Sequence, residues 1–358
     1  MPRVLAALFL VLVLVAVDSP AQAKREPVGL DRFVPHHAYR GDFSDPSIVR
    51  IGHTWYAYAT TLSWLNLPMM RSRHLKAWFP VARTHRRWSR DGLPQPPRWA
   101  KTRRIRGHRA AVTWAPSVRR VGHHYVLAYA TRLRRHPRRL CIGVATARRP
   151  VGPFVNRGRR PLVCRRDRSV IDPYVFVGPR GGRWLYWKTQ PRGRTTSKIW
   201  VRMLNRRGIG FARHRRLGRH AHVLVRASRR WEGGTVENPA MIHFHRHFYL
   251  FYSGNLWATR HYATGYAICR GPHGPCHRPV RRRLLQTGGH RAGPGGASPF
   301  VDRRGRLRLL YAAWDRRNIG YDVKSLCIHR AIGCGQRKLH VAILKVRHHG
   351  RLRVVRRG

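Results

Sequence analysis

Residues 45–60 read DPSIVRIGHTWYAYAT, and four later stretches follow the same plan. Each has a small or polar residue, a proline, a run of β-forming residues, a turn, and a second run rich in aromatic and aliphatic side chains. The later stretches are APSVRRVGHHYVLAYA at 115–130, DPYVFVGPRGGRWLYW at 172–187, NPAMIHFHRHFYLFYS at 238–253 and SPFVDRRGRLRLLYAA at 298–313. Proline can begin a strand but cannot sit inside a central one, and both runs have strand length. Each stretch therefore predicts a β-hairpin.

The spacing of the five hairpins indicates what surrounds them. Their prolines stand at positions 46, 116, 173, 239 and 299, which leaves room for two further strands after most hairpins. Runs at 140–146, 199–204, 262–269 and 339–346 are candidates for these strands, and helical periodicity is absent. Four-stranded units repeated radially form a propeller. The sequence thus predicts an all-β fold, a five-bladed β-propeller with four antiparallel strands per blade.

A radial fold brings equivalent residues of every blade to one axis. The residues before the five prolines are Asp45, Ala115, Asp172, Asn238 and Ser298, and Glu237 directly precedes Asn238. The chain has only 13 Asp and Glu against 74 Lys and Arg. Chance is therefore a poor explanation for three acids at convergent positions. An Asp before Pro can also simply cap a turn. We nevertheless expect Asp45, Asp172 and Glu237 to share one site.

These residues lie within motifs that resemble family 43 of the glycoside hydrolases. The motifs follow the family's order across residues 42–315: SDPS at 44–47, TWAPS at 113–117, IDP at 171–173, GTVENP at 234–239, YLFYSGN at 249–255 and GPGGAS at 293–298. The resemblance implies a five-bladed propeller that hydrolyses arabinofuranosides or xylosides with inversion. It also implies that Asp45 is the general base and Glu237 the general acid, and that Asp172 modulates the pKa of Glu237 and helps to orient it.

The implied chemistry explains why three acids are needed. An inverting glycosidase protonates the leaving oxygen from one carboxylic acid, while a second carboxylate activates water on the other face of the sugar. A neighbouring carboxylate helps the acid to keep its proton, since a second buried negative charge is disfavoured. Family members often carry a histidine associated with a central cation where Gly296 stands. We therefore expect no central Ca²⁺ and no other cofactor.

Aromatic and histidine side chains provide further candidates. Trp114, beside a repeat position, and Trp257 and Trp187 are candidates for stacking on a sugar, with core packing as the alternative. Residues His243, His245 and His247 alternate like metal ligands on a strand. They fall at the end and turn of the fourth hairpin, which favours a scaffold role, so we expect no metal site.

The amino terminus is typical of an exported protein. Arg3 precedes an apolar run at 6–17, and Ala-Gln-Ala at 21–23 offers a cleavage site. The run is shorter than the roughly 20 residues of a membrane span. We expect a signal peptide at 1–23, a single catalytic domain at 24–358, and a secreted, extracellular monomer without a membrane span. The cysteine spacing suggests disulfides Cys269/Cys276, Cys327/Cys334 and Cys141/Cys164, although spacing alone leaves the connectivity open.

The net charge of +61 leaves other functions open. So basic a surface favours non-specific adhesion to polyanions such as acidic cell-wall polymers or nucleic acid. Alternatively, a compositional bias places Arg at permissive surface positions, and no motif indicates specific nucleic-acid binding. The main prediction is a hydrolase of plant cell wall polysaccharides or oligosaccharides. The alternatives are a catalytically silent carbohydrate-binding propeller and a polyanion-binding one.

Overall fold

A computed structural model describes residues 41–61, 65–81, 90–105, 107–191, 193, 195–213, 217, 219–321 and 335–357. The expected signal peptide at 1–23 and the pair Cys327/Cys334 lie outside these residues. Among the described residues, no helix has the length and apolar character needed to cross a bilayer.

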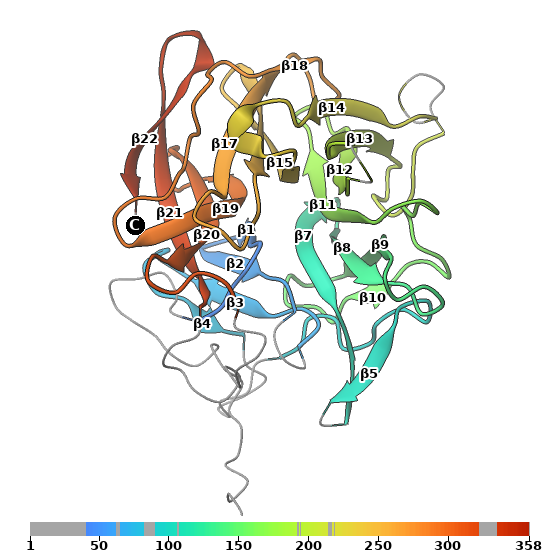
Figure 1. Ribbon diagram of the computed structural model, residues 1–358. Helices are drawn as coiled ribbons and strands as arrows, with labels where there is room; N and C mark the ends of the chain where they lie inside the picture. Colours follow the sequence, from blue (N-terminus) through green and yellow to red (C-terminus); the bar gives the residue numbers. More distant parts are fainter. Residues whose placement is uncertain are drawn as a thin grey trace, which may run out of the picture.

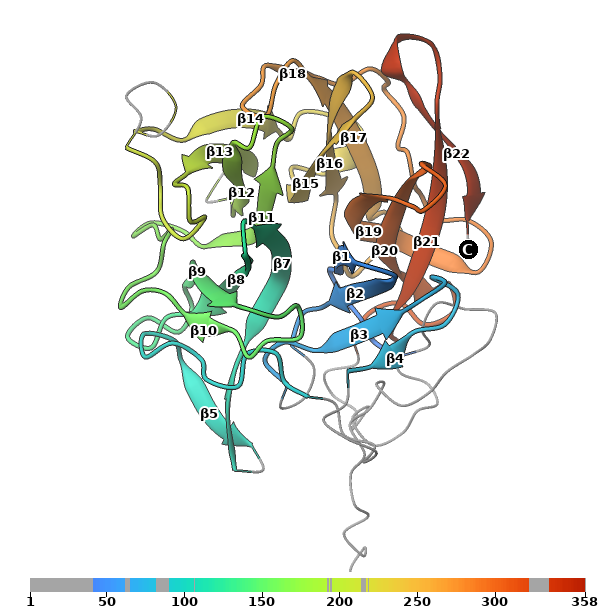
Figure 2. The ribbon, with the colours of Figure 1, turned by 180° about the vertical axis from the view of Figure 1, so that it is seen from behind.

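Five antiparallel sheets of four strands surround a common centre (Figures 1 and 2). Blade 1 contains β1 (Ser47–Ile51), β2 (Thr54–Tyr58), β3 (Met69–Ser72) and β4 (Phe79–Pro80). Blade 2 contains β7 (Thr113–Val121), β8 (His124–Arg132), β9 (Leu140–Ala147) and β10 (Val155–Asn156). Blade 3 contains β11 (Val170–Val177), β12 (Arg183–Thr189), β13 (Lys198–Leu204) and β14 (His222–Arg226).

The other two blades repeat this order. Blade 4 contains β15 (Val236–Phe244), β16 (His247–Gly254), β17 (Ala263–Cys269) and β18 (Cys276–His277). Blade 5 contains β19 (Arg291–Val301), β20 (Leu307–Asp315), β21 (Arg337–Val346) and β22 (Leu352–Arg357). Outside the blades lie a hairpin of β5 (Thr102–Ile105) and β6 (His108–Ala111) and two 3₁₀ turns, η1 (Arg230–Glu232) and η2 (His348–Gly350). The predicted all-β propeller and its four-stranded blades are confirmed.

The core lies between neighbouring blades, and the ring closes where blade 5 meets blade 1. Each blade uses consecutive strands, so this junction is held by packing and hydrogen bonds. Trp55 of β2 packs edge-on against Phe300 of β19 at 4.9 Å between ring centroids. The amide of Phe43 donates to the carbonyl of Arg337, 2.9 Å away. The closing junction thus reaches the segment that carries Asp45.

The first strand of a blade lies nearest the centre (Figure 1), and in blades 2 to 5 it is interrupted by a bulge. The bulges lie between Trp114 and Ser117, Ile171 and Tyr174, Glu237 and Ala240, and Gly295 and Ser298. The bulged residues have positive φ, as does Asp45: Asp45 50°, Ala115 43°, Asp172 55°, Asn238 48° and Gly296 62°. A bulge aims a side chain away from the regular pleat, here toward the axis.

This pattern corrects one sequence assignment. The fifth member of the ring is Gly296, whereas Ser298, which we expected there, pairs regularly with Leu310 of β20. Alignment on Pro299 shifted the repeat by two residues, because no proline follows Gly296, whereas a proline follows the ring residue of every other blade.

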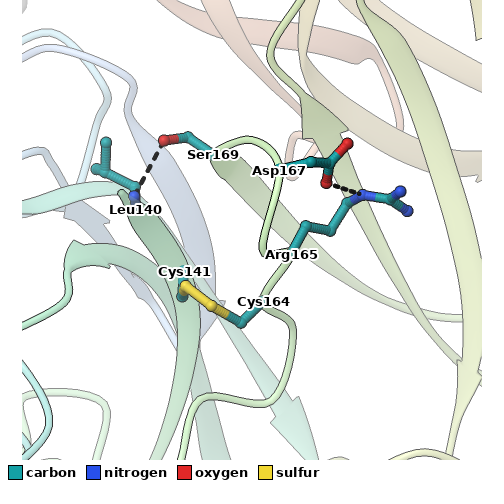
Figure 3. The surroundings of a disulfide bond; sticks show 6 residues. All are labelled: Leu140, Cys141, Cys164, Arg165, Asp167 and Ser169. Atoms are coloured by element: carbon teal, nitrogen blue, oxygen red, sulfur yellow. Dashed lines mark hydrogen bonds and ion pairs between the residues drawn. A yellow bond between two sulfur atoms is a disulfide. The ribbon is translucent and has the colours of Figure 1, made fainter. Parts of the chain in front are cut away.

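Two of the three expected disulfides are confirmed. Cys141 of β9 is bonded to Cys164, and Cys269 of β17 is bonded to Cys276 of β18. Figure 3 shows the first, with Ser169 Oγ accepting a hydrogen bond from the amide of Leu140 at 3.0 Å. Both contacts fasten the segment between blades 2 and 3 to the start of β9. Ser169 directly precedes β11, the strand that carries Asp172.

Candidate active site

Asn238 connects the acids at the axis. Its backbone amide donates to Asp172 Oδ2 at 3.0 Å, and its side-chain Nδ2 donates to Asp45 Oδ1 at 3.1 Å. Glu237 is the preceding residue on β15. The acids of blades 1, 3 and 4 therefore meet at one place, although residues 45 and 238 are 193 positions apart in the chain.

Asp45 is surrounded by hydrogen-bond donors. Besides Asn238, Thr60 Oγ1 donates to its Oδ2 at 3.0 Å, and Arg337 Nη1 lies 3.5 Å from its Oδ1. Burial raises the pKa of Asp45 most, the charge of Glu237 raises it further, and these three donors lower it. Its side chain remains 21% exposed, so water can reach the carboxylate.

Glu237 is held by two groups from neighbouring strands. Lys188 Nζ of β12 lies 2.5 Å from Glu237 Oε2, and the hydroxyl of Tyr262 donates to Oε1 at 2.7 Å. The Lys188 side chain is 3% exposed, so this ion pair is shielded from solvent screening. Tyr262 also accepts a hydrogen bond from Asn238 Nδ2 at 3.0 Å, which links the surroundings of Glu237 to those of Asp45.

The pKa of Asp172 is strongly raised. Burial and then the charge of Glu237 raise its pKa to about 8, against the opposing effect of Lys188. Two buried carboxyl groups that repel each other cannot both ionise easily. The neighbouring carboxylate thus favours the protonated form of Asp172 at neutral pH.

Comparison with known proteins agrees with this geometry. Residues 38–330 match the profile of the family described as Glycosyl hydrolases family 43. The chain belongs to that family. As a family 43 member it is a glycoside hydrolase. No curated protein sequence matches it significantly.

Solved structures share the fold. A thermostable family-43 glycoside hydrolase is 22% identical, with a TM-score of 0.71 over 93% of this chain and 96% of the other. An endo-1,4-beta-xylanase from Bacteroides thetaiotaomicron VPI-5482 is 20% identical, with a TM-score of 0.65 over 88% of this chain and 94% of the other. An exo-1,5-alpha-L-arabinanase from a bovine ruminal metagenomic library is 19% identical, with a TM-score of 0.64 over 90% of this chain and 99% of the other.

Sequence reasoning missed three residues of this family 43 site: Lys188, Tyr262 and Arg337. Arg337 of β21 is 2% exposed; its guanidinium faces Asp45, and its Cζ lies 5.2 Å from the centre of the Tyr262 ring. One arginine cannot be singled out in a chain with 74 Lys and Arg. Lys188 left a weak signal, because it is one of few lysines in an arginine-rich chain and lies on a strand beside aromatic residues.

A fourth acid, Asp42, extends the site toward an aromatic cluster. Asp42 Oδ1 accepts from the Arg337 amide at 2.8 Å and from the hydroxyl of Tyr321 at 2.8 Å. Burial raises the pKa of Asp42 to about 6, and these donors oppose the rise. The ring of Tyr321 lies 5.6 Å from that of Trp257. Trp257, 39% exposed, therefore lies at the edge of the site.

Of the other two tryptophan candidates, Trp114 adjoins the ring of bulged residues at the axis, and Trp187 lies in the core. Trp114 is half-buried directly before the bulged Ala115, with Arg132 Cζ 5.8 Å from the centre of its ring. Trp187 is 5% exposed and packs in the core between blades 2 and 3. The structure thus brings Trp257 toward the carboxylates and gives the ring of Trp187 a packing environment.

The histidines that alternate like metal ligands pack against aromatic side chains. His243 packs against Phe248 at 4.6 Å and His247 against Tyr249 at 5.7 Å between ring centroids. Within the described ranges, no group of three or more His, Cys, Asp or Glu could hold a metal ion. A Cβ on Gly296 would lie 2.8 Å from Asp45 Oδ1, so the position where the family often has a histidine offers no ligand and no space. These residues do not fit a central cation held by such a histidine.

Proposed function

We propose that this glycoside hydrolase is a secreted enzyme that cleaves arabinofuranosyl or xylosyl linkages of plant cell wall polysaccharides with inversion of configuration. The observation that carries the proposal is the set of three mutually interacting carboxyl groups around Asn238, each in a different environment. The similarity in fold to an arabinanase and a xylanase supports the choice of sugars.

The environments support a division of roles. Asp45 accepts hydrogen bonds from Thr60 and Asn238 and remains partly open to water, as expected of a base that activates a water molecule. We assign protonation of the leaving oxygen to Glu237, which Lys188 and Tyr262 hold in position. Asp172, fixed by the Asn238 amide, then acts by charge on its neighbour. Inversion requires room for a water, with acid and base roughly 6.5–9.5 Å apart.

Substrates whose leaving groups differ in their need for a proton test these roles. Glu237→Ala should cripple hydrolysis of natural glycosides, whose leaving alkoxides need a proton, and harm a dinitrophenyl glycoside far less. Asp45→Ala should harm both substrates alike, since neither reacts without activated water. Asp167→Ala, which removes a surface acid paired with Arg165, is the control and should retain full activity.

The stereochemical course provides an independent check. Proton NMR of the first-formed sugar should show the inverted anomer, because no covalent intermediate intervenes. A retained product, or rescue of Asp45→Ala by azide to a retained glycosyl azide, would make Asp45 a nucleophile. If the wild type cleaves neither aryl α-L-arabinofuranosides nor aryl β-D-xylosides, the proposed sugars are wrong.

Secretion has its own test. When the full chain is expressed with an active export pathway, sequencing of the extracellular protein should find an amino terminus at Lys24, after Ala-Gln-Ala. Replacing the apolar run at 6–17 by polar residues should keep the protein inside the cell. Extracellular protein that still begins at residue 1 or 2 would contradict cleavage.

A further inference from the structure

A basic groove lies at the junction of blades 1 and 5, at the strand ends opposite the carboxylates. It has a volume of about 1480 Å³. Its walls come from β2, β3 and β4 of blade 1 and from the β19–β20 turn, β20 and β21 of blade 5. Figure 2 shows β3 and β4 beside β21. The volume exceeds the roughly 300–1,000 Å³ of small-molecule pockets, which suits a segment of polymer.

The groove is separate from the active site. Asp45 lies just before β1, whereas groove residue Thr54 follows the turn at the other end of that strand. Likewise Gly296 lies within β19, and groove residue Asp302 follows its far end. At about 3.3 Å per strand residue, groove residue Thr54 is about 20 Å from Asp45, and groove residue Val341 is about 13 Å along β21 from Arg337, which contacts Asp45.

The groove has a higher proportion of basic residues than the chain as a whole. Seven of its 17 lining residues are Arg or Lys, against 74 of 358 in the chain. Asp302 is the one acid among the described lining residues, and Arg306 and Arg308 already neutralise it, at 2.9 Å and 2.5 Å from its Oδ2. Four exposed side chains have no acceptor or ion-pair partner among the described residues: Arg71, Arg73, Lys76 and Arg304.

Fixed turns hold these cations in place. On blade 1, Ser72 Oγ accepts hydrogen bonds from the amides of Leu75 at 2.9 Å and His74 at 3.3 Å, which shapes the loop that carries Arg73 and Lys76. On blade 5, Asp302 Oδ1 accepts from the amides of Arg304 and Arg306. Arg303 Nη2 donates to the carbonyl of His53 at 2.5 Å. This bond joins the β19–β20 turn to the turn between β1 and β2, and charges on fixed turns lose less entropy when they bind a ligand.

We propose that this groove binds an acidic polysaccharide, a chain of sugars that carry carboxylates. Four free cations along a concave surface match carboxylates repeated along a polymer, and binding releases the polymer's counterions. Single-stranded nucleic acid would need aromatic platforms for successive bases. Here Trp55 is 3% exposed, and Phe79, 51% exposed, is the one large exposed aromatic side chain among the lining residues. This binding rests on the assignment of the chain to family 43, and it is independent of which sugar linkage the active site cleaves.

The test compares two triple variants with the same loss of charge. The groove variant is Arg71→Gln, Arg73→Gln and Arg304→Gln. The control is Arg120→Gln, Arg180→Gln and Arg246→Gln, which are exposed arginines at the hairpin turns of blades 2, 3 and 4 on the same side of the molecule. Binding to polygalacturonate, neutral xylan and single-stranded DNA is measured by calorimetry at several salt concentrations.

The groove variant should bind polygalacturonate about tenfold more weakly, and the slope of log affinity against log salt should fall by about 2. The control should change by less than about twofold, and both variants should hydrolyse a neutral aryl glycoside like the wild type. Equal losses in the two triples would show that net charge, and not the groove, binds the polymer. A greater loss of DNA binding than of polygalacturonate binding in the groove variant would assign the groove to nucleic acid and overturn the proposal. Failure of aryl glycoside hydrolysis in the wild type would instead reject the proposed function.

Discussion

At the scale of single residues, the site is organised by Asn238 and Lys188. Asn238 holds Asp172 and Asp45 through separate donors, and Lys188 places a buried ammonium against Glu237. Removing one partner of a buried ion pair leaves an uncompensated charge and costs several kcal/mol. Lys188 also lowers the pKa of Asp172, so its ammonium lowers the pH at which Asp172 loses its proton.

This argument predicts a change in pH dependence for Lys188→Met. Without the ammonium, the pKa of Asp172 rises above its value of about 8, because the cation no longer favours the ionised form. The proton is then lost at higher pH, so the alkaline limb of kcat/KM should move upward. The measurement is a pH–rate profile with an aryl glycoside that needs acid assistance.

The control for this experiment is Lys338→Met, which removes a half-exposed partner of Asp315. Its alkaline limb should coincide with that of the wild type. An unchanged or lower limb in Lys188→Met would mean that the proton on Asp172 does not govern the alkaline limb.

At the scale of elements, the bulge on the innermost strands decides where the acids point. Non-glycine residues rarely adopt positive φ, yet Asp45, Ala115, Asp172 and Asn238 all do. In blade 5 the corresponding residue is Gly296, and the reason is contact as well as conformation. A Cβ there would lie 2.8 Å from Asp45 Oδ1 and 3.0 Å from Asp45 Cα. Blade 5 thus leaves space for the carboxylate of blade 1.

Gly296→Ala should therefore displace Asp45 and lower kcat/KM by roughly tenfold to a hundredfold, since small misplacements of a catalytic group are costly. Gly305→Ala is the matched control. Gly305 also has positive φ, 71°, but a Cβ there meets nothing within 4 Å. It should cost about 1 kcal/mol of stability and leave activity unchanged. Similar kinetics in the two variants would show that contact with Asp45 is unimportant.

At the scale of the whole molecule, the junction of blades 1 and 5 serves both sites. It is the one junction of the ring that no chain connection bridges, because blade 1 is built from the first strands and blade 5 from the last. The same junction contains the ion pair between Arg337 and Asp45 and, at the opposite strand ends, the basic groove. Packing between the two blades therefore keeps the proposed base in position.

Trp55→Ala tests this role. Trp55 is 3% exposed and packs on Phe300, so its truncation should cost about 3–5 kcal/mol. We expect activity at 25 °C to fall by roughly tenfold as Arg337 and Asp45 shift. Trp184→Ala, a truncation of comparable burial between blades 3 and 4, should destabilise similarly but remain active. Urea unfolding and aryl glycoside kinetics measure both effects, and equal activity losses would contradict a special role for the junction.

The sequence alone determined the hairpins, the number of blades and the convergence of Asp45, Asp172 and Glu237. Those features depend on local patterns, namely proline before a β-rich run, which a radial repeat maps onto one axis. The tertiary structure decided what surrounds the acids. Lys188 reaches Glu237 across 49 residues and Arg337 reaches Asp45 across 292, and the choice of Gly296 over Ser298 follows from the bulge between Gly295 and Ser298. The pKa of Asp172 and the basic groove likewise arise only when separate blades pack together, because burial and charge proximity are properties of contacts between strands.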